Sequence, residues 1–599
     1  MESSIAVPVH EQATGSTTLA DLIGLAAARH GDATAIRHKR DGAWHDVSYA
    51  ELGETVSEIG RGLIDLGIEP GDRVAILCAT RPDWTYADFG IAATGAVVVP
   101  IYPTNSPEEC EWVAGNSGAR AIVCEDATQV AKIDRVRANL PALETVIVID
   151  PAGVDDAGVL TLDAVRERGR ARDAAELDER ARAVTREQPF TIIYTSGTTG
   201  PPKGCILTHG NYRDVVSMCE RDAIVLSGDV AYLFLPLAHS FALLIQLAVL
   251  DMGATLAYVG GGPKEIVVEL SEVRPTYLPS VPRIFEKLYT LVTAHGDPDQ
   301  IRAATQVGLK VRALQAAGQE VPPELQAHFD GAEEALFKNV RAAFGGRLRQ
   351  ATSGAAPIAT EILEFFFACG VPVLEGYGMT ETATAATAST IHNYRFGSVG
   401  RPLPGMEVRI AEDGEVLLKG PNIFQGYYRN DDASFGAIVD GWMHTGDLGR
   451  VDDDGFLYIT GRKKDIIITA GGKNLTPANL ENDLKQSRWI SQAVMHGDRR
   501  PYPVALITLD PEEIVVFARE HGLPEDPAAL SREPAVIELI QGELDRVNER
   551  YAQVEKIKRF ALLDHDLSQE TGELTPTLKV KRNVVNEKYA DVIDALYEG

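Results

Sequence analysis

The sequence predicts an α/β protein with a large N-terminal domain, a small antiparallel β subdomain inside it and a small α+β C-terminal domain. Three observations support this. Short apolar runs alternate with helix-like segments over much of the chain, short strands joined by acidic-glycine turns follow Gly397, and a mixed pattern with long helices follows Arg462. With 599 residues the chain also exceeds the ~250–300 residues that one hydrophobic core usually serves, so several domains are expected.

The first alternating block extends from about Thr18 to Asp150. Its apolar, β-branched runs are 73–78, 96–101, 121–124 and 145–149. Alternation of such runs with helical segments is typical of parallel strands covered by helices. The stretch 151–188 is rich in Ala, Arg, Glu and Asp, and is interpreted as a solvated connection to the next strand, Phe190–Tyr194.

A second alternating block opens with a strand at 230–235, an apolar helix from about Phe241 to Met252 and a strand at 255–259, which together predict a βαβ unit. The pattern continues with a helix at 264–272, a strand at 276–278, a helix opened by Pro282, a strand at 349–353, a helix at 358–369 and a strand at 371–374. Residues 290–347 are largely helical and charged in character, and we interpret them as an insertion.

Hairpin turns mark the third region. Glu412–Glu415 and Asp453–Phe456 are acidic-glycine turns between short strands, so a β subdomain is placed at about 397–461 within a large domain 1–461. In the predicted C-terminal domain, 465–599, Thr476 and Pro477 are suited to the N-cap and first residue of a helix.

Charge and composition exclude several classes of protein. The chain has 57 basic and 86 acidic residues, a net charge of −29, which disfavours binding to nucleic acids. A small anionic substrate must then be held by local donors, because salt screens charges beyond ~10 Å. Six scattered cysteines form no C-x-x-C pair, and neither a signal peptide nor an integral membrane segment is visible, so a cytoplasmic protein is expected.

The most informative segment is YTSGTTGPPKG, from Tyr194 to Gly204, directly after a predicted strand. Its glycines let the backbone approach a ligand, its hydroxyl groups are neutral donors, and Lys203 adds a positive charge, a combination suited to phosphates. It is not a Walker loop, because Pro202 stands where that motif requires glycine. A flexible surface turn would account for a few of these residues but not for all eleven in this order.

This segment resembles the first signature of the adenylate-forming enzymes, the superfamily of acyl-CoA synthetases, luciferases and nonribosomal adenylation domains. The other signatures of that superfamily follow in order as GYGMTE (376–381), GWMHTGD (441–447), GRKKD (461–465) and GGK (471–473). The match runs from the first domain to near the C-terminus, and the chain is most similar to long-chain fatty-acyl-CoA synthetases. The resemblance implies stacked α/β sheets in the large domain and a mobile C-terminal domain.

The resemblance also implies an ATP site. The residues it places on the nucleotide are Thr195, Ser196, Gly197, Thr198, Thr199, Gly200, Lys203, Gly354, Ala355, Ala356, Glu375, Gly376, Tyr377, Gly378, Met379, Thr380, Asp447, Arg462 and Lys579. Glu381 would bind Mg²⁺ with Ser196 as partner, since Mg²⁺ prefers hard oxygen ligands. Thr380 would donate to the α-phosphate, and Asp447 would accept the ribose hydroxyls. Taken alone, Glu381 would be a solvated surface acid and Asp447 a turn former.

His239 lies in LPLAHSF (235–241), between a strand and the apolar helix. By base rate such a histidine is packed and hydrogen-bonded rather than catalytic. The resemblance places His239 near the acyl and phosphate groups, and Phe241 beside it in the acyl pocket. The apolar helix fits a wall of a fatty-acyl tunnel and ordinary core equally well.

Near the C-terminus, the resemblance assigns Lys579 the role of the lysine that reaches the reacting carboxylate and the α-phosphate. Many relatives have glycine directly before this lysine, whereas Leu578 stands here, so Lys581 remains an alternative. The resemblance further implies a hinge at 462–464, with Lys464 at the hinge position. It also implies a loop that enters the site in the thioester-forming state, made of Gly471, Gly472 and Lys473.

The implied reaction is long-chain fatty acid–CoA ligation. The fatty carboxylate attacks ATP, pyrophosphate leaves, and the CoA thiol then displaces AMP from the acyl-AMP; ATP, Mg²⁺ and coenzyme A are required. An ionised carboxylate needs no general base near pH 7. Three alternatives stay open: an acyl-AMP ligase that loads a carrier protein, a luciferase-type oxygenase and a non-catalytic nucleotide-binding scaffold. A homodimer and peripheral contact with membranes are also left open.

Overall fold

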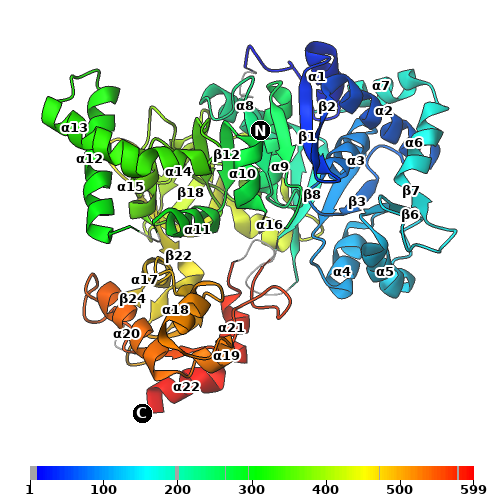
Figure 1. Ribbon diagram of the computed structural model, residues 1–599. Helices are drawn as coiled ribbons and strands as arrows, with labels where there is room; N and C mark the ends of the chain where they lie inside the picture. Colours follow the sequence, from blue (N-terminus) through cyan, green and yellow to red (C-terminus); the bar gives the residue numbers. More distant parts are fainter. Residues whose placement is uncertain are drawn as a thin grey trace.

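The molecule has a large α/β lobe and a small lobe formed by the C-terminal part of the chain, coloured from dark yellow to red in Figure 1. The computed structural model describes residues 10–195, 201–262, 265–293, 296–470, 473–575 and 579–598. The chain passes from one lobe to the other through strand β22 (Leu457–Arg462) and the short 3-10 turn Lys463–Asp465. The predicted fold class is confirmed.

An eight-stranded sheet forms one layer of the large lobe, in the order β19-β9-β8-β4-β3-β5-β6-β7. Its strands are β3 (Arg73–Leu77), β4 (Val97–Ile101), β5 (Ala121–Cys124), β6 (Thr145–Val148), β7 (Leu160–Thr161), β8 (Pro189–Thr195), β9 (Lys203–Thr208) and β19 (Gly426–Tyr427). β3 to β6 are parallel and almost entirely buried, as their β-branched runs predict. The intervening helices are α3 (Pro82–Ala93), α4 (Pro107–Ser117) and α5 (Ala127–Val136).

A nine-stranded sheet forms another layer, in the order β16-β15-β14-β13-β12-β10-β11-β1-β2. Its strands are β1 (Thr34–Arg40), β2 (Ala43–Ser48), β10 (Val230–Leu233), β11 (Thr255–Tyr258), β12 (Tyr277–Ser280), β13 (Gln350–Ser353), β14 (Val373–Tyr377), β15 (Thr387–Ala388) and β16 (Arg401–Pro402). β10, β12, β13 and β14 are parallel neighbours. Their carboxyl ends therefore share one edge, the usual ligand-binding edge of an open α/β sheet.

Two buried helices, α8 (His209–Arg221) and α9 (Ser240–Asp251), pack against both large sheets. Every residue of α9 is buried, in accordance with its apolar sequence. α9 begins at the carboxyl edge of β10, where His239 is its N-cap. This arrangement places His239 and Phe241 at the same edge as the loops that follow β13 and β14.

The stretch 151–188 is exposed or half-buried at most of its residues, as its composition indicated, but it is also helical. It contains α6 (Leu162–Arg170) and α7 (Ala174–Ala183), and α6 packs closely on α2 (Tyr49–Asp65). The two helices can approach closely because Gly62 has no side chain. An added Cβ at this position would lie 2.1 Å from the Val165 carbonyl oxygen. The prediction did not include this packing, because some of the charged residues are paired: Arg166 and Arg170 both bind the buried Glu58 carboxylate.

The predicted helical character of 290–347 is confirmed. The segment comprises the end of α11 (Pro282–Thr293), α12 (Pro298–Ala316), α13 (Pro323–Ala332), a π-helical turn (Glu333–Phe337) and α14 (Lys338–Ala343). α12 lies against α15 (Thr360–Ala368), where Gly308 faces Ala368. The remaining helices of the large lobe are α1 (Leu22–His30), α10 (Ile266–Val273) and α16 (Asp431–Ala437).

The predicted antiparallel subdomain is a five-stranded sheet. Its strands are β17 (Glu407–Ile410), β18 (Glu415–Lys419), β20 (Ile438–Val439), β21 (Trp442–Val451) and β22. The region 397–461 is less uniform than expected, because β16 joins the nine-stranded sheet and β19 joins the eight-stranded sheet. Short exchanged strands of this kind tie the antiparallel sheet to both large sheets.

The small lobe has a three-stranded sheet, a two-stranded hairpin and six helices within its described residues. Its elements are β23 (Ile467–Ile468), β24 (Asn474–Leu475), α17 (Pro477–Leu484), β25 (Ile490–His496), β26 (Val504–Leu509), α18 (Glu513–His521), α19 (Pro527–Leu530), α20 (Pro534–Asn548), β27 (Arg559–Leu562), α21 (Arg582–Lys588) and α22 (Ala590–Glu598). Thr476 and Pro477 open a helix as predicted.

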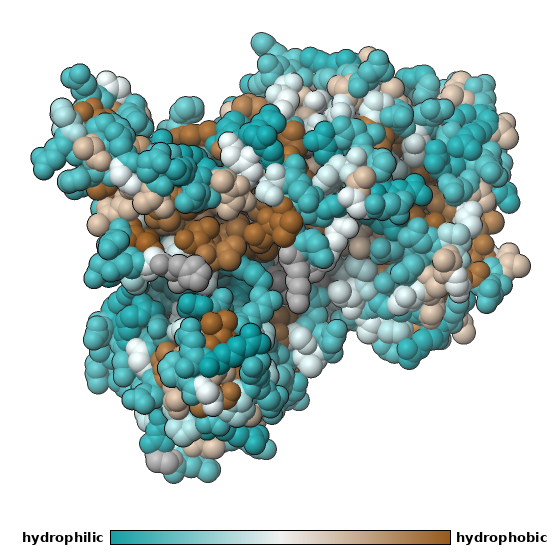
Figure 2. Space-filling model, viewed as in Figure 1, coloured by the Kyte–Doolittle hydropathy of each residue, from teal (hydrophilic) through white to brown (hydrophobic). Residues whose placement is uncertain are grey.

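Figure 2 shows a mostly hydrophilic surface, with hydrophobic side chains gathered on the part of the large lobe that overlooks the small lobe. Among the described residues, none of the helices combines the length and the hydropathy needed to cross a bilayer. All six cysteines are buried and free.

Candidate active site

The GYGMTE motif ends β14 and continues into the 3-10 turn Thr380–Thr382. Gly378 is required there, since an added Cβ would lie 2.0 Å from the Thr384 carbonyl oxygen. The chain leaves the turn through Ala383 and Thr384 at φ of 46° and 95°, a region that L-residues rarely adopt. Strained backbone of this kind clusters at functional sites. The turn presents Glu381 at the carboxyl edge of the sheet.

Tyr377, Asp447 and Arg462 form one hydrogen-bonded chain. The Tyr377 hydroxyl donates to Asp447 Oδ2 at 2.7 Å, and Arg462 Nε donates to Asp447 Oδ1 at 3.1 Å. Asp447 and Arg462 are direct cross-strand partners on β21 and β22. Burial and the Asp447 charge raise the pKa of Tyr377, so its hydroxyl is a neutral donor. Three predicted nucleotide-binding residues thus meet from three strands.

A second chain links Glu381 to the first signature loop. The Tyr427 hydroxyl donates to Glu381 Oε1 at 2.7 Å, and Lys203 Nζ lies 5.1 Å from the centroid of the Tyr427 ring. β19 carries Tyr427 and pairs with β9, which begins at Lys203. Sequence reasoning missed Tyr427, because it belongs to none of the signatures and only the strand pairing reveals its place.

His239 and Phe241 lie at the start of α9. The Phe241 N–H donates to His239 Nδ1 at 3.2 Å, so the imidazole caps the helix. Burial, with a smaller contribution from the nearby Lys579 charge, lowers the pKa of His239 to about 3. The ring is therefore neutral at physiological pH. An added Cβ on Gly354 would lie 3.4 Å from Phe241 Cε1, so this predicted adenine-binding glycine contacts the predicted acyl-pocket residue.

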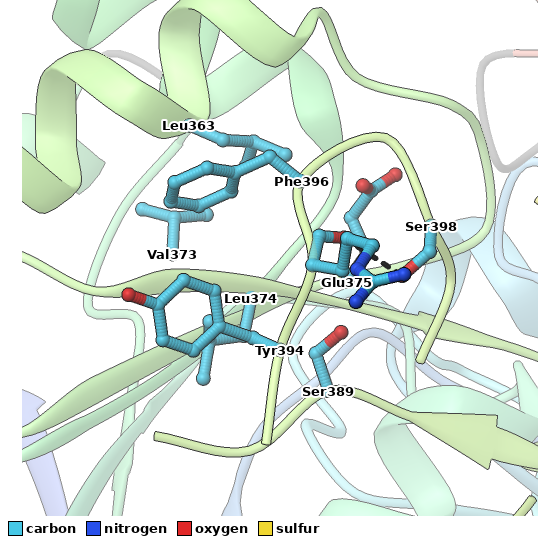
Figure 3. A pocket seen from close by; sticks show the side chains of 9 residues that line it. Leu363, Val373, Leu374, Glu375, Ser389, Tyr394, Phe396 and Ser398 are labelled. Atoms are coloured by element: carbon cyan, nitrogen blue, oxygen red, sulfur yellow. Dashed lines mark hydrogen bonds between the residues drawn. The ribbon is translucent and has the colours of Figure 1, made fainter. Parts of the chain in front are cut away.

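Glu375 points into a small pocket beside β14 (Figure 3). Apolar side chains of Leu363 and Phe396 and the Ser398 hydroxyl group line this pocket with it. Burial raises the pKa of Glu375 to about 8, against the opposing effect of a hydrogen bond from the Ile358 N–H. Glu375 is therefore largely protonated at neutral pH and can donate as well as accept a hydrogen bond.

Lys579 extends from the small lobe toward these groups. Its ammonium is affected by the charges of Arg462, Asp447 and Glu381, and it in turn acts on His239. Burial and the Arg462 charge lower the pKa of Lys579 to about 8, whereas the two carboxylates oppose that shift. No comparable effect of Lys581 on a site residue is found among the described residues, and its N–H instead donates to the Glu573 carbonyl oxygen.

The other predicted residues divide into three groups. Thr195 and Lys203 are register partners on β8 and β9, Thr380 is buried, and the Met379 N–H donates to Thr382 Oγ1. Lys464, Lys473 and Ala356 are exposed, and Ala355 has a φ of 71°. Ser196, Gly197, Thr198, Thr199, Gly200, Gly471 and Gly472 lie outside the described residues.

The donor set around Glu381 suits Mg²⁺. Among residues of the described ranges there is no cluster of three or more His, Cys, Asp or Glu side chains that could hold a metal. Mg²⁺ is usually bound by one or two carboxylates together with substrate phosphates and waters, rather than by an all-protein cage. A single carboxylate at the strand edge, with Lys203 nearby for phosphate oxygens, fits that pattern.

The site combines loops at the carboxyl edge of the sheet, the Asp447–Arg462 pair and Lys579 from the small lobe. This combination is typical of the adenylate-forming class of enzymes. Residues 25–428 match the AMP-binding enzyme family and residues 464–599 match the AMP-binding enzyme C-terminal domain. The chain therefore belongs to the AMP-binding enzymes, which confirms the resemblance predicted from the signatures.

The relatives with assigned activities include long-chain-fatty-acid–CoA ligases. The ligase FadD15 of Mycobacterium tuberculosis is 39% identical over 567 residues, covering 93% of each chain. The ligase ACSBG1 of Homo sapiens is 31% identical over 614 residues, which is 95% of this chain and 84% of that protein.

Solved structures share the fold. Anthranilate CoA ligase AuaEII in complex with anthranoyl-AMP matches with a TM-score of 0.73 at 21% identity, over 97% of this chain and 98% of that chain. A Mycobacterium tuberculosis fatty acyl CoA synthetase matches with a TM-score of 0.62 at 22% identity, over 96% and 99% of the chains.

Proposed function

We infer that this protein is a long-chain fatty acid–CoA ligase that forms acyl-AMP and pyrophosphate from fatty acid and ATP, and then acyl-CoA and AMP. The names of its relatives support the substrate class. The observation that carries the chemistry is that the charges of Glu381, Asp447 and Arg462 in the large lobe act on the Lys579 ammonium of the small lobe. These groups belong to separate elements, and a nucleotide bound among them would give them a common function.

The first half-reaction brings together two anions, a carboxylate and a polyphosphate. Lys203 of the large lobe and Lys579 of the small lobe supply positive charge, and preorganised charge of this kind is a large contributor to catalysis. Asp447 accepts the ribose hydroxyls, held in place by Tyr377 and Arg462. His239, neutral because of its lowered pKa, adds no charge and can hydrogen-bond to the acyl carboxylate.

Glu381 is the proposed Mg²⁺ ligand, positioned by the hydroxyl of Tyr427. When bound, Mg²⁺ neutralises phosphate charge and holds the polyphosphate in one orientation. Phe241, packed against Gly354, is the proposed start of the acyl pocket, and the buried helix α9 extends from it into the core.

Two lobe arrangements are proposed for the two half-reactions, because the CoA thiol must reach the carbonyl where Lys579 now lies. The arrangement seen here is the adenylation state. Three ion pairs hold it: Arg283–Asp510 at 2.8 Å, Lys287–Glu512 at 2.9 Å and Arg550–Glu361 at 3.4 Å. Lys464 in the exposed turn after β22 is the proposed hinge residue, with the domain division at 462–464. The loop 471–473 is proposed to enter the site after rotation.

The decisive experiment is isotope exchange between pyrophosphate and ATP, with and without a long-chain fatty acid. We expect exchange that depends strictly on the acid and on Mg²⁺, followed by CoA-dependent release of AMP. Absence of exchange would indicate a nucleotide-binding scaffold. Exchange without CoA-dependent AMP release would indicate a carrier-loading ligase. A cytoplasmic location, a homodimer and peripheral membrane contact remain predictions.

A further inference from the structure

Lys579 belongs to an antiparallel pairing of 573–575 with 579–581, which is called the hairpin below and has its root at Glu573. Leu574 and Val580 form an antiparallel bridge, and the Lys581 N–H donates to the Glu573 carbonyl oxygen at 2.7 Å. Further along, the Thr575 N–H donates to the Lys579 carbonyl oxygen at 2.8 Å. The backbone position of Lys579 therefore depends on whatever holds this root.

The Glu573 carboxylate is fully buried and surrounded by donors. Lys588 Nζ lies 2.7 Å from its Oε1, and the Ser568 N–H donates to Oε2 at 3.2 Å. The hydroxyls of Thr571 and Tyr589 also donate to it. Burial alone would raise the pKa of Glu573, but these hydrogen bonds lower it to about 2. The carboxylate is thus ionised at every working pH.

The donors come from both sides of the hairpin in sequence. Ser568 and Thr571 precede it, whereas Lys588 ends α21 and Tyr589 follows that helix. His565 Nε2, which bonds to the Tyr589 hydroxyl at 3.0 Å, lies 3.6 Å from Glu573 Oε1. The carboxylate therefore connects the chain that enters the hairpin with the helix that leaves it.

Stability alone does not explain a buried charge of this kind. Desolvation offsets much of the attraction in a buried ion pair, and an apolar replacement of similar volume is often equally stable. Buried charges of this sort are best known for fixing one arrangement among several. Here the arrangement that Glu573 fixes is the register and direction of the hairpin, and hence the reach of Lys579.

We propose that Glu573 is a positioning residue for adenylation, which acts through Lys579 by anchoring the root of its hairpin to α21. The inference rests on the proposed role of Lys579 in forming acyl-AMP. Glu573 touches neither substrate nor reacting atoms, because its carboxylate is enclosed by residues of the small lobe.

The test compares the full-length Glu573→Gln variant with Glu587→Gln, a matched control on the exposed side of α21. Both half-reactions are measured, acid-dependent pyrophosphate–ATP exchange and thioester formation from supplied acyl-AMP and CoA. We expect Glu573→Gln to lower exchange by about 10–100-fold, the scale of a misplacement near 1 Å. Thioester formation and the control variant should stay at the wild-type rate. Equal loss of both half-reactions would overturn the proposal.

A double-mutant cycle separates positioning from general damage. In a Lys579→Ala background, Glu573→Gln should lower exchange no further, since the group it positions is already gone. Additive losses would contradict the proposal. If Lys579→Ala itself left exchange unchanged, the proposed function of Lys579 would fail instead. Should Glu573→Gln not fold, Tyr589→Phe removes one donor from the carboxylate, and the same selective loss of exchange is expected.

Discussion

The Tyr377 hydroxyl donates to Asp447 Oδ2 across 2.7 Å, which joins β14 of the nine-stranded sheet to β21 of the antiparallel sheet. A tyrosine and an aspartate 70 residues apart in sequence are thus joined by a hydrogen bond. The other carboxylate oxygen, Asp447 Oδ1, accepts a hydrogen bond from Arg462. Both oxygens are therefore oriented before a ligand binds. Preorganisation of this kind reduces the entropy lost on binding.

Tyr377→Phe is expected to weaken ATP binding. A hydrogen bond to a charged group contributes ~1.5–3 kcal/mol, so the KM for ATP should rise by about tenfold or more while the KM for fatty acid changes little. Tyr458→Phe is the control, because Tyr458 also donates to an aspartate, Asp452, on the antiparallel sheet at 3.1 Å. An unchanged KM for ATP in Tyr377→Phe would show that Asp447 needs no such orientation.

Lys579→Ala should reduce acid-dependent pyrophosphate–ATP exchange by about 10²–10³-fold, the scale for removing a group aimed at developing charge. Thioester formation from supplied acyl-AMP should survive. Lys581→Ala resolves the alternative left open by the sequence, and we expect it to retain exchange. If Lys581→Ala instead lost pyrophosphate–ATP exchange while Lys579→Ala retained it, Lys581 would be the adenylation lysine.

The pKa of Lys579, lowered to about 8, predicts a pH limit on adenylation. Burial and Arg462 disfavour the ammonium, whereas Asp447 and Glu381 favour it. Only the protonated form can neutralise phosphate charge, so kcat/KM for ATP should be maximal below about pH 8 and fall as pH rises through it. An ordinary lysine would keep its proton until pH ~10.4. Lys579→Arg should abolish the fall, and a wild-type profile that stays flat up to pH ~10 would contradict the prediction.

Reversing one charge between the lobes should shift the balance of the two half-reactions. In Arg283→Glu, repulsion from Asp510 replaces the 2.8 Å ion pair, and exchange should drop by about twofold to fivefold, the range for exposed pairs. Thioester formation should not drop. Adding Asp510→Arg should restore exchange. Arg302→Glu is the control, because Arg302 pairs within α12 with Asp299. If exchange did not recover in the Arg283→Glu/Asp510→Arg double variant, the ion pair between the lobes would not support adenylation.

Glu381→Gln should raise the Mg²⁺ concentration that gives half-maximal exchange. Loss of the carboxylate charge is expected to weaken Mg²⁺ binding by at least about tenfold, because even residues that only hydrogen-bond to a metal ligand contribute that much to the affinity. Titration of Mg²⁺ at fixed ATP measures the effect, with the exposed Glu412→Gln as control. An unchanged Mg²⁺ dependence would remove Glu381 from the metal site.

Periodicity identified the elements that are buried on both faces. The four β-branched runs became β3 to β6, and the apolar run after His239 became α9, because burial selects apolar residues whatever the partner. Periodicity did not identify α6 and α7, because these helices are rich in charged residues, some of which form ion pairs. Composition alone cannot distinguish a paired arginine from a solvated one, since the partner Glu58 lies more than a hundred residues away.

The sequence by itself determined the fold class and the superfamily, because glycine-dependent turns such as Gly378 leave a recognisable pattern in consecutive residues. Only the tertiary structure decided that Tyr427 contacts Glu381, that the Asp447 charge acts on Lys579, and that the Glu573 carboxylate is buried among hydrogen-bond donors. Each of these relationships joins residues from separate elements. Packing between sheets and lobes sets such distances, and residue spacing along the chain carries no record of them.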